Sequence, residues 1–344
     1  MARTNALPAL GGLLAALALP ATAALTIDWV TVGNAGNAAD AATGYGAVGY
    51  EYKIARNETT IGQYAEFLNA AAKSDPYMLY STSMTTSSIN GISRSGVSGS
   101  YSYTVNPGSA NKPITFVSWF DAARFCNWLH NGQGSGSTET GAYTLNGATI
   151  GTYTVNPGAK AWIPSENEWY KAAYYDPTKG GTGGYWLYAT QSNALGGNTI
   201  GAANSANYWA GGYVGYPGMA LTDVGAYGAN SDSFYGTNDQ GGNVWEWNDA
   251  VISDSYRGLR GGSWSDIGDA LRSSNRGSNV PWDGNSSVTG FRVATVPEPD
   301  SMVLSLLIGG GTMLLRRRRL RQHRQTPLRG HQKPAGNRRE NGIH

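Results

Sequence analysis

Cysteine and histidine are nearly absent from the main body of this chain. Its 344 residues include one cysteine, Cys126, and four histidines, of which only His130 lies before residue 320. A single cysteine excludes an intrachain disulfide and any metal site built from several thiolates. One histidine leaves no cluster that could bind iron and no clear base for a serine nucleophile. The fold must therefore be stabilised by packing.

Charged residues are also few, at 14% of the sequence, and they are unevenly distributed. Residues 24–299 contain 14 Lys and Arg against 21 Asp and Glu, a net charge of about −7, whereas ten basic residues follow Asp300. The isoelectric point near 8.5 thus describes the C-terminal tail and not the main body. Because the main body has no basic face, it is not expected to bind nucleic acid.

The N-terminal hydrophobic run is too short to span a membrane. Residues 7–19 are almost free of polar side chains, but roughly 20 such residues are needed to cross a bilayer. Arg3 precedes the run, and the small triplet Ala21-Thr22-Ala23 follows it. This order is typical of a secretory signal peptide, here residues 1–23, cleaved after Ala23. A short N-terminal anchor is the alternative.

The C-terminal region combines three features in a fixed order. The motif Pro297-Glu298-Pro299 precedes an apolar segment, residues 302–315, which ends at four consecutive arginines, residues 316–319. This order resembles the PEP-CTERM sorting signal, here residues 296–320, which implies recognition by an exosortase in the envelope of a Gram-negative bacterium. A plain membrane anchor with its arginines inside is the alternative. Both place the main body outside the cytoplasm, in the envelope, on the outer surface or in the matrix, and residues 321–344 are predicted to be a disordered basic tail.

Glycine and large aromatic residues dominate the main body. Glycine supplies 48 residues, and Trp and Tyr together supply 32, so that the glycine fraction is about twice the usual one. This mixture predicts a loop-rich domain held together by aromatic clusters rather than by long helices.

A few segments show regular periodicity. Amphipathic spacing predicts helices over residues 59–68 and 118–129, and a third helix is expected over residues 165–175, ending before Pro177. Short strands are expected over residues 52–54, 114–116 and 291–294. Residues 81–111 are predicted to be an inserted loop or hairpin, and the similar segments 103–108 and 153–158 to be hairpins with Asn-Pro-Gly turns.

Five sequence blocks follow one another between residues 50 and 295. They contain Glu58-Thr59-Thr60, residues 113–119, residues 163–169, residues 241–247, and residues 259–264 followed by residues 290–293. In this order they resemble the formylglycine-generating-enzyme domain, also called the sulfatase-modifying factor domain. The resemblance implies an α+β fold, a single domain of C-type-lectin-like topology over residues 50–295, with little regular secondary structure, short twisted antiparallel strands and a few helices. Residues 24–49 would form a lead-in.

Three glutamates within these blocks need specific partners. Glu246 is flanked by two tryptophans, so that it requires a cation or an arginine. Glu166 and Glu168 fall in the first turn of a predicted helix, where the helix dipole favours carboxylates. For Glu168 we expect an ion pair with an interior arginine, such as Arg260 or Arg292.

The resemblance also implies a structural calcium ion. The family ligands are a side-chain oxygen, two backbone carbonyls and a glutamate, which correspond here to Asp239, Gly242, Val244 and Glu246. Hard oxygen ligands of this kind suit calcium. A second family site would begin at Asn207 and Tyr208, but residues 211–219 lack the acidic residue expected there, so that this site is expected to be weak. The alternative is that these oxygens cap turns.

The residues for the family's oxidation chemistry are missing. The resemblance implies a copper ion held by two cysteines that follow the Gly-Gly-Ser-aromatic block, because soft Cu(I) prefers thiolates. The first of these positions corresponds to Asp266, and residues 265–274 contain no cysteine. No copper is therefore expected, and Cys126 is predicted to be a buried core residue.

Three functions remain open. The first is a non-catalytic module that binds an envelope glycan or an extended peptide in a groove on loops. The second is a divergent oxidoreductase or other protein-modifying enzyme, for which carboxylate chemistry by the aspartates of that groove is an option. The third is a matrix component that acts by being displayed. The residues expected to form the groove are Trp264, Asp266, Asp269, Arg272, Arg276, Trp282 and Asp283.

Overall fold

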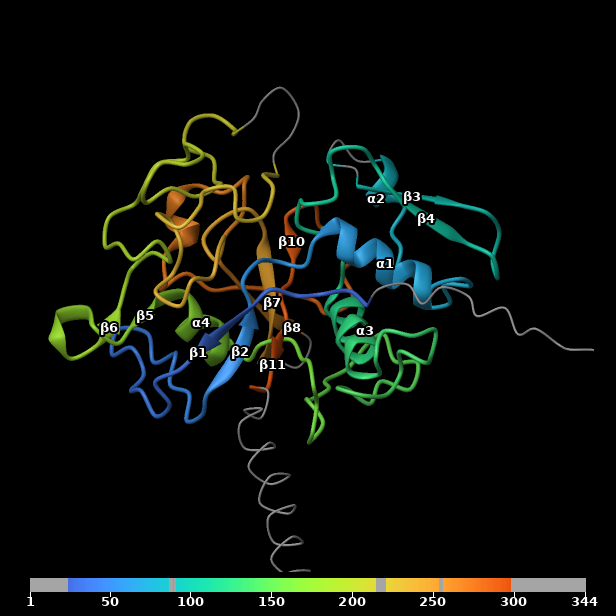
Figure 1. Cartoon of the computed structure of the whole chain (residues 1–344), viewed down its shortest axis with the longest axis horizontal. Helices are drawn as coiled ribbons and strands as arrows, with labels where there is room; N and C mark the ends of the chain where they lie inside the picture. The colour runs from blue at the N-terminus through green and yellow to red at the C-terminus, as the bar shows by residue number, and fades with distance from the viewer. Residues whose placement is uncertain (1–23, 87–88, 90, 215–220, 254–255, 298–344) are drawn as a thin grey trace, which may run out of the picture. The chain divides into compact units, whose positions relative to one another are not determined.

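The computed structural model describes residues 24–86, 89, 91–214, 221–253 and 256–297 (Figure 1). The chain divides into two compact units, residues 1–296 and residues 297–344. The proposed signal peptide and nearly all of the sorting segment, including Glu298 and Pro299, lie outside the described residues.

A three-stranded antiparallel sheet joins segments near the two ends of the described part of the first unit. It contains β1 (Trp29–Val32), β2 (Tyr52–Ala55) and β11 (Ala294–Thr295), in the order β1-β2-β11. Val30 pairs with Ile54 in register, and these two side chains are buried together with Val32 and Tyr52. The predicted lead-in therefore contributes a strand to the domain, because β1 provides an apolar edge for β2.

A four-stranded sheet forms the centre of the domain. Its order is β10 (Thr289–Gly290), β7 (Trp245–Ser253), β8 (Tyr256–Arg260) and β9 (Gly277–Asn279). The β10–β7 pair is parallel and the others are antiparallel. In Figure 1 the strands β7 and β8 run through the middle, with α4 on one side and α1 and α3 on the other.

The three predicted helices are confirmed as α1 (Ile61–Ala71), α3 (Trp119–His130) and α4 (Glu166–Tyr174). Each begins after a hydroxyl-bearing N-cap, at Thr60, Ser118 and Ser165. In each case the cap accepts a hydrogen bond from the backbone of the residue three positions later, whose side chain bonds back to the cap backbone. These reciprocal capping boxes satisfy two backbone N–H groups that the helix leaves free. The short helices are α2 (Ser83–Thr86), η1 (Lys179–Gly181) and η2 (Gly268–Leu271).

The predicted insertion contains a hairpin, β3 (Ile92–Ser95) and β4 (Ser102–Val105), followed by a turn at Asn106. A second small hairpin pairs β5 (Tyr175–Asp176) with β6 (Gly184–Tyr185). The similar segment at residues 153–158 forms the turn but no strand.

The expected strand at residues 114–116 is wrong. Ile114 donates to Thr59 and Phe116 donates to Ser286, and Phe116 has φ of 61°. A positive φ is outside the strand region, so that the segment turns here. At the C-terminal end, only Ala294 of the expected strand 291–294 belongs to a strand.

Aromatic rings fill the main core, as the composition predicts. Tyr64, Phe67, Phe125 and Phe291 pack with ring centroids 5.3 to 6.5 Å apart. Such pairs stabilise beyond the area that they bury. Cys126 is completely buried in the same cluster, as predicted. The domain is thus a mixed α+β fold with few helices and short, mainly antiparallel strands.

Candidate functional site

Trp282 separates two neighbouring cavities on the surface of the domain. The smaller has a volume of about 230 Å³ and the larger about 570 Å³. Trp282 and Ile150 line both. Trp282 is 48% exposed, so that part of its surface is available to a ligand. We call the two cavities together the Trp282 groove.

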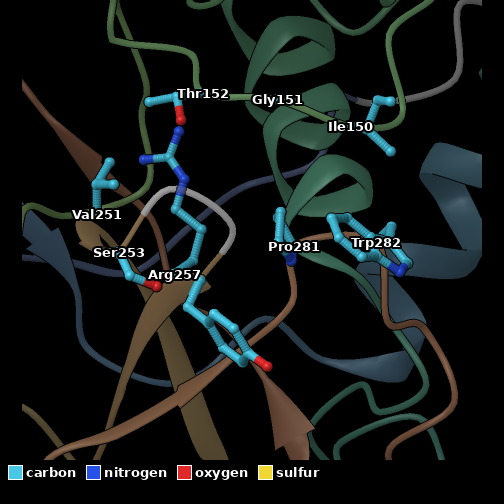
Figure 2. A pocket seen from close by; sticks show the side chains of 9 residues that line it. Ile150, Gly151, Thr152, Val251, Ser253, Arg257, Pro281 and Trp282 are labelled. Carbon is cyan, nitrogen blue, oxygen red and sulfur yellow. The ribbon is translucent and has the colours of Figure 1, made fainter.

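The smaller cavity lies where β7 and β8 meet the segment 150–152 (Figure 2). Figure 2 shows Ile150 and Trp282 on one side and Val251 and Ser253 on the other, with the Arg257 side chain extending toward Thr152. Arg257 is held by its own contacts.

Arg257 Nη1 donates to the Asp249 carboxylate at 2.8 Å, and Nη2 donates to the Tyr153 carbonyl at 2.6 Å. The guanidinium also lies 3.9 Å from the centre of the Trp119 ring. Burial raises the pKa of Asp249 to about 7, although Arg257 opposes this rise. The Arg257 side chain is therefore held in place at the cavity wall, and its charge is already paired with Asp249.

The larger cavity is formed by segments that are far apart in the sequence. Its walls come from residues 75–82, from Arg94 on β3, from the start of α3, and from the segments 149–150 and 282–285. Tyr77, Tyr80 and Phe120 supply aromatic surface, and Asp75 and Asp121 supply carboxylates.

Arg94 lies between two tyrosines on one wall of the larger cavity. Its guanidinium carbon is 4.6 Å from the Tyr80 ring centre and 4.3 Å from the Tyr101 ring centre. Nη1 pairs with Asp75 at 3.4 Å. Asp75 also accepts backbone hydrogen bonds from Leu79 and Tyr80, while burial raises its pKa. The contacts of Asp75 hold the segment 75–80, which carries Tyr77 and Tyr80.

Arg124 is completely buried beneath the same cavity. Nε and Nη2 donate to the two Glu139 oxygens at 2.8 and 3.0 Å, and the guanidinium carbon lies 4.2 Å from the Tyr77 ring centre. Its Nη1 has no hydrogen-bond partner among the described residues. A buried donor without a partner is costly, so that Nη1 is an unsatisfied donor beneath this cavity.

Asp121 lies one helical turn before Arg124 and lines the same cavity. Its Oδ2 accepts from the Ser118 backbone at 2.8 Å and from the Ser118 hydroxyl at 2.7 Å. Burial raises the pKa of Asp121 to about 7, although these hydrogen bonds and Arg124 oppose the rise.

Exposed apolar side chains surround the groove. Large hydrophobic side chains are exposed at five of its positions, namely Met78, Ile150, Val251, Tyr256 and Trp282. Single exposed apolar residues are ordinary, but a contiguous group around a cavity is typical of a binding surface.

The sequence-predicted groove residues are distributed more widely. Of the seven, Trp282 lines the two cavities of the groove. Trp264 packs on Tyr213, with ring centres 5.5 Å apart, and Asp269 pairs with Arg272 at 3.2 Å. Asp283 accepts from Asn279 at 2.7 Å and from the Asn285 backbone at 3.0 Å.

Asp266, for which the sequence resemblance predicts the first copper-cysteine position, is hydrogen-bonded to its neighbours. It accepts hydrogen bonds from Trp245 Nε1 at 2.9 Å and from the Ser263 hydroxyl at 2.5 Å. A carboxylate with these two donors supports the loop structurally.

The residues that sequence reasoning missed belong to the larger cavity: Tyr77, Tyr80, Arg94, Asp121 and Arg124. One signal was available, because Arg124 stands in a helix that is otherwise mostly apolar. A charged residue at such a position needs specific partners when it is buried.

The interior arginine Arg260 pairs with Glu166, and not with Glu168 as the sequence predicts. Arg260 pairs with Glu166 at 2.7 Å, and Arg276 pairs with the same carboxylate at 2.6 Å. Glu168 accepts instead from Tyr50, Trp162 and the Ser165 backbone, so that the expected arginine partner for Glu168 is wrong. The reason is the capping box, which turns the Glu168 side chain back toward the helix start.

Glu246 has the arginine partner that its position between two tryptophans requires. Arg292 donates to both Glu246 oxygens at 2.6 Å, and Trp169 Nε1 donates to Oε2 at 2.7 Å. Neither Glu246 nor Arg292 is exposed.

Residues 30–296 match the family model described as "Sulfatase-modifying factor enzyme 1-like domain". The chain belongs to this family. Similar solved structures include CarF, with 22% identity, a match that covers 80% of this chain and 100% of CarF, and a TM-score of 0.46. Variable protein 1 of Treponema denticola has 19% identity, a match that covers 81% of this chain and 100% of that protein, and a TM-score of 0.47. PvdO of Pseudomonas aeruginosa is a third, with 18% identity, a match that covers 79% of this chain and 93% of PvdO, and a TM-score of 0.40. A comparison with curated proteins gives no match.

The calcium site implied by this family can be tested against the residues present. Both Glu58 carboxylate oxygens are buried and have no hydrogen-bond partner in the described part of the chain. Burial and the nearby Asp239 raise the pKa of Glu58. An orphaned carboxylate beside a second one fits a hard cation, which would satisfy both.

Glu246 fits the same ion less well, because Arg292 and Trp169 already bind its oxygens. Asp239 accepts one backbone hydrogen bond, from Gly225 at 2.6 Å. Within the described ranges, no three Asp, Glu, His or Cys residues form a metal-ligating group. Of the side chains considered, the Glu58 and Asp239 carboxylates fit a cation better than Glu246 does, and the carbonyl ligands at Gly242 and Val244 stay a prediction.

The positions of the second family site are occupied by protein contacts. Asn207 Nδ2 donates to Asn243 at 3.0 Å, and its carbonyl accepts from the Asn243 backbone at 2.8 Å. The Tyr208 carbonyl accepts from Asn198 at 3.3 Å. These contacts connect the segment to the Gly242 loop. A weak calcium site there stays a prediction.

No helix within the described residues is long and apolar enough to cross a membrane.

Proposed function

We propose that this chain is an exported, envelope-associated binding module that holds an extended glycan or peptide in the Trp282 groove. The observation that carries the proposal is the half-exposed Trp282 ring between two cavities of about 230 and 570 Å³. The volume of the larger cavity is within the range of ligand pockets in proteins, which have a mixed apolar and polar lining. The groove is built on regular elements, because Arg94 is on β3, Arg124 is on α3 and Arg257 is on β8.

Formylglycine formation is not part of the proposal. Residues 265–274 contain no cysteine, and Asp266 occupies the first copper-ligand position. The one cysteine, Cys126, is completely buried, and burial raises its thiol pKa well above the usual range. A buried thiol of high pKa is a poor metal ligand and a poor nucleophile.

Calcium is proposed as a structural ion. Asp239 and Glu58 would supply carboxylate oxygens, and Gly242 and Val244 would supply carbonyl oxygens. When bound, the ion supplies positive charge that offsets two buried carboxylates. The site is in the loop that precedes β7, so that its effect would be on the stability of the domain.

Export and sorting are proposed from the sequence. Residues 1–23 would be removed after Ala23, and the segment 296–320 would be recognised by an exosortase or would anchor the chain in the membrane. Mass spectrometry of the protein recovered from its host tests both points. The proposal expects an N-terminus at Ala24, whereas retention of residues 1–23 on exported protein would contradict it.

Binding is tested with the full chain on envelope polysaccharides and on a peptide library, in calcium and in chelator. Saturable binding that is lost in Trp282→Ala supports the proposal. Trp209→Ala is the matched control, because Trp209 is 41% exposed and does not line the groove. Equal binding by both variants would contradict the placement of the site.

An enzyme is the second candidate, because the family model is that of an enzyme. It would be a divergent oxidoreductase or another protein-modifying enzyme. A redox metal that co-purifies with the chain at stoichiometry would favour it. Calcium alone would favour the binding module.

A further inference from the structure

We propose that the larger cavity of the Trp282 groove binds a neutral saccharide, with vicinal hydroxyls bound by Arg124 Nη1 and Asp121 and a sugar ring packed on Trp282. This inference rests on the proposed binding function and names its ligand class. Four observations carry it.

The first observation is the unpaired donor. Arg124 is fully buried, lines the cavity and uses Nε and Nη2 on Glu139, while Nη1 has no partner in the described residues. Buried guanidinium N–H groups are normally satisfied. A fixed donor without an acceptor in the described part of the chain therefore belongs to a residue that lines the cavity.

The second observation is a neighbouring acceptor. Asp121 is three residues before Arg124 on α3, and side chains at this spacing are adjacent on a helix surface. Both line the larger cavity. A ligand that satisfies both must accept from the arginine and donate to the aspartate. Adjacent hydroxyl groups of a sugar can do both at once, since each hydroxyl is a donor and an acceptor.

The third observation is the charge of the groove. Its three arginines are already paired, Arg94 with Asp75, Arg124 with Glu139, and Arg257 with Asp249. Asp121 has no ion-pair partner within the distance limit of a salt bridge among the described residues. An anionic glycan, a phosphate or an acidic peptide would find no free positive charge here, and Asp121 would repel it whenever its carboxyl group is ionised. The ligand that fits is neutral.

The fourth observation is the aromatic surface. Trp282 presents an exposed ring at the boundary of the two cavities, and Tyr77 and Tyr80 line the larger one. Sugar rings have apolar C–H faces and polar edges. A tryptophan ring in contact with solvent packs against such faces while hydrogen bonds form at the edges. Because Trp282 lines both cavities, the ligand would extend from one into the other as an oligosaccharide.

An extended peptide fits the larger cavity less well. Peptides that bind in extended form usually pair their backbone with a strand edge. Here loops and the start of α3 provide most of the wall, and Arg94 is the residue that β3 contributes. Peptide binding is therefore an outcome of the test and not the proposal.

The test is calorimetry of the full chain in calcium, with neutral hexasaccharides of glucose and mannose, an acidic hexasaccharide of galacturonate, and a peptide library. The variants are Trp282→Ala and Asp121→Asn, with Trp209→Ala as control. Asp121→Asn keeps an oxygen that can accept from Ser118, so that the helix cap is retained. Circular dichroism establishes that each variant folds.

At least one neutral hexasaccharide is expected to bind, at least tenfold more weakly in Trp282→Ala and about threefold to tenfold more weakly in Asp121→Asn. Trp209→Ala should bind like the original chain. Tighter binding of the acidic sugar, or no effect of Trp282→Ala, would overturn the inference. Peptide binding that depends on Trp282, without saccharide binding, would overturn it and leave the proposed function intact. No binding by the folded chain would overturn both.

Discussion

Arg292 and Glu246 form a two-point ion pair in the core, with both nitrogen–oxygen distances at 2.6 Å and neither side chain exposed. Arg292 also donates to the carbonyls of Ala55 and Asn238. The pair thus connects β7, the end of β2 and the loop before β7. A buried ion pair is stable only when its geometry is good and its other atoms are bonded, as they are here.

Removing one member of this pair should strongly destabilise the domain. In Arg292→Met the Glu246 charge remains buried with Trp169 as its nearest donor, and such changes cost about 3–5 kcal/mol. The measurement is the free energy of unfolding in urea. Arg272→Ala is the control, because the Arg272–Asp269 pair is exposed and should contribute less than about 1 kcal/mol. Similar losses in the two variants would contradict the structural role of Arg292.

Calcium should stabilise the chain through Glu58 and Asp239. At a concentration about 100 times the dissociation constant, binding adds roughly 2.7 kcal/mol, a rise of about 5 °C in Tm for a domain of this size. Thermal unfolding in calcium and in chelator measures the difference. It should be lost in Glu58→Gln and kept in the exposed control Glu51→Gln. A calcium effect that Glu58→Gln leaves unchanged would remove Glu58 from the site.

The loop that would hold calcium should not tolerate a side chain at Gly242. This residue has φ of 90°, and a Cβ there would lie 2.3 Å from the Asn207 carbonyl oxygen. Gly242→Ala is expected to cost about 3 kcal/mol or more, from backbone strain and from the clash. Gly108→Ala is the control, because its φ is 76° but no atom lies within 4 Å of its Cβ. Chemical denaturation should show a clearly smaller loss for Gly108→Ala; equal losses would mean that the close approach to Asn207 relaxes.

Asp121 should make stability depend on pH. Burial raises its pKa to about 7 in the folded chain, from 3.8 as the ordinary value. A raised folded pKa means that the protonated form is favoured by folding. The contribution of Asp121 to stability is therefore fully present below about pH 4 and is lost as the pH rises toward 7, by up to ~4 kcal/mol.

Asp121→Asn should flatten this dependence, so that stability falls less between pH 5 and pH 8 than in the original chain. Urea unfolding at both pH values measures the difference between variant and original. Asp269→Asn, at an exposed position, should leave the pH profile unchanged. A variant profile parallel to the original would show that Asp121 is ionised over the whole range.

Local features of the fold could be predicted from the sequence. The three main helices begin at Thr60, Ser118 and Ser165 because the cap and its partner lie three residues apart, within one turn. The arginine requirement of Glu246 followed from its two tryptophan neighbours. Which arginine pairs with which glutamate could not be predicted. Glu166 and its partner Arg260 are 94 positions apart, and Glu168, which lies two residues after Glu166, is an equally acidic candidate.

The groove was predicted only at Trp282. Its other walls come from residues 75–82, β3, α3 and residues 149–150, and no local pattern places these segments together. The expected strand at residues 114–116 failed for a related reason. Phe116 takes a positive φ to bond with Ser286, a residue 170 positions later that closes the loop beside Trp282.

The most direct test of the Trp282 groove is the binding of the full chain to the envelope polysaccharide of its host, measured in calcium for the original chain, Trp282→Ala and Trp209→Ala. The groove predicts saturable binding that weakens at least tenfold in Trp282→Ala and is unchanged in Trp209→Ala. Binding that is equal in all three proteins, or that is lost only in Trp209→Ala, would contradict it.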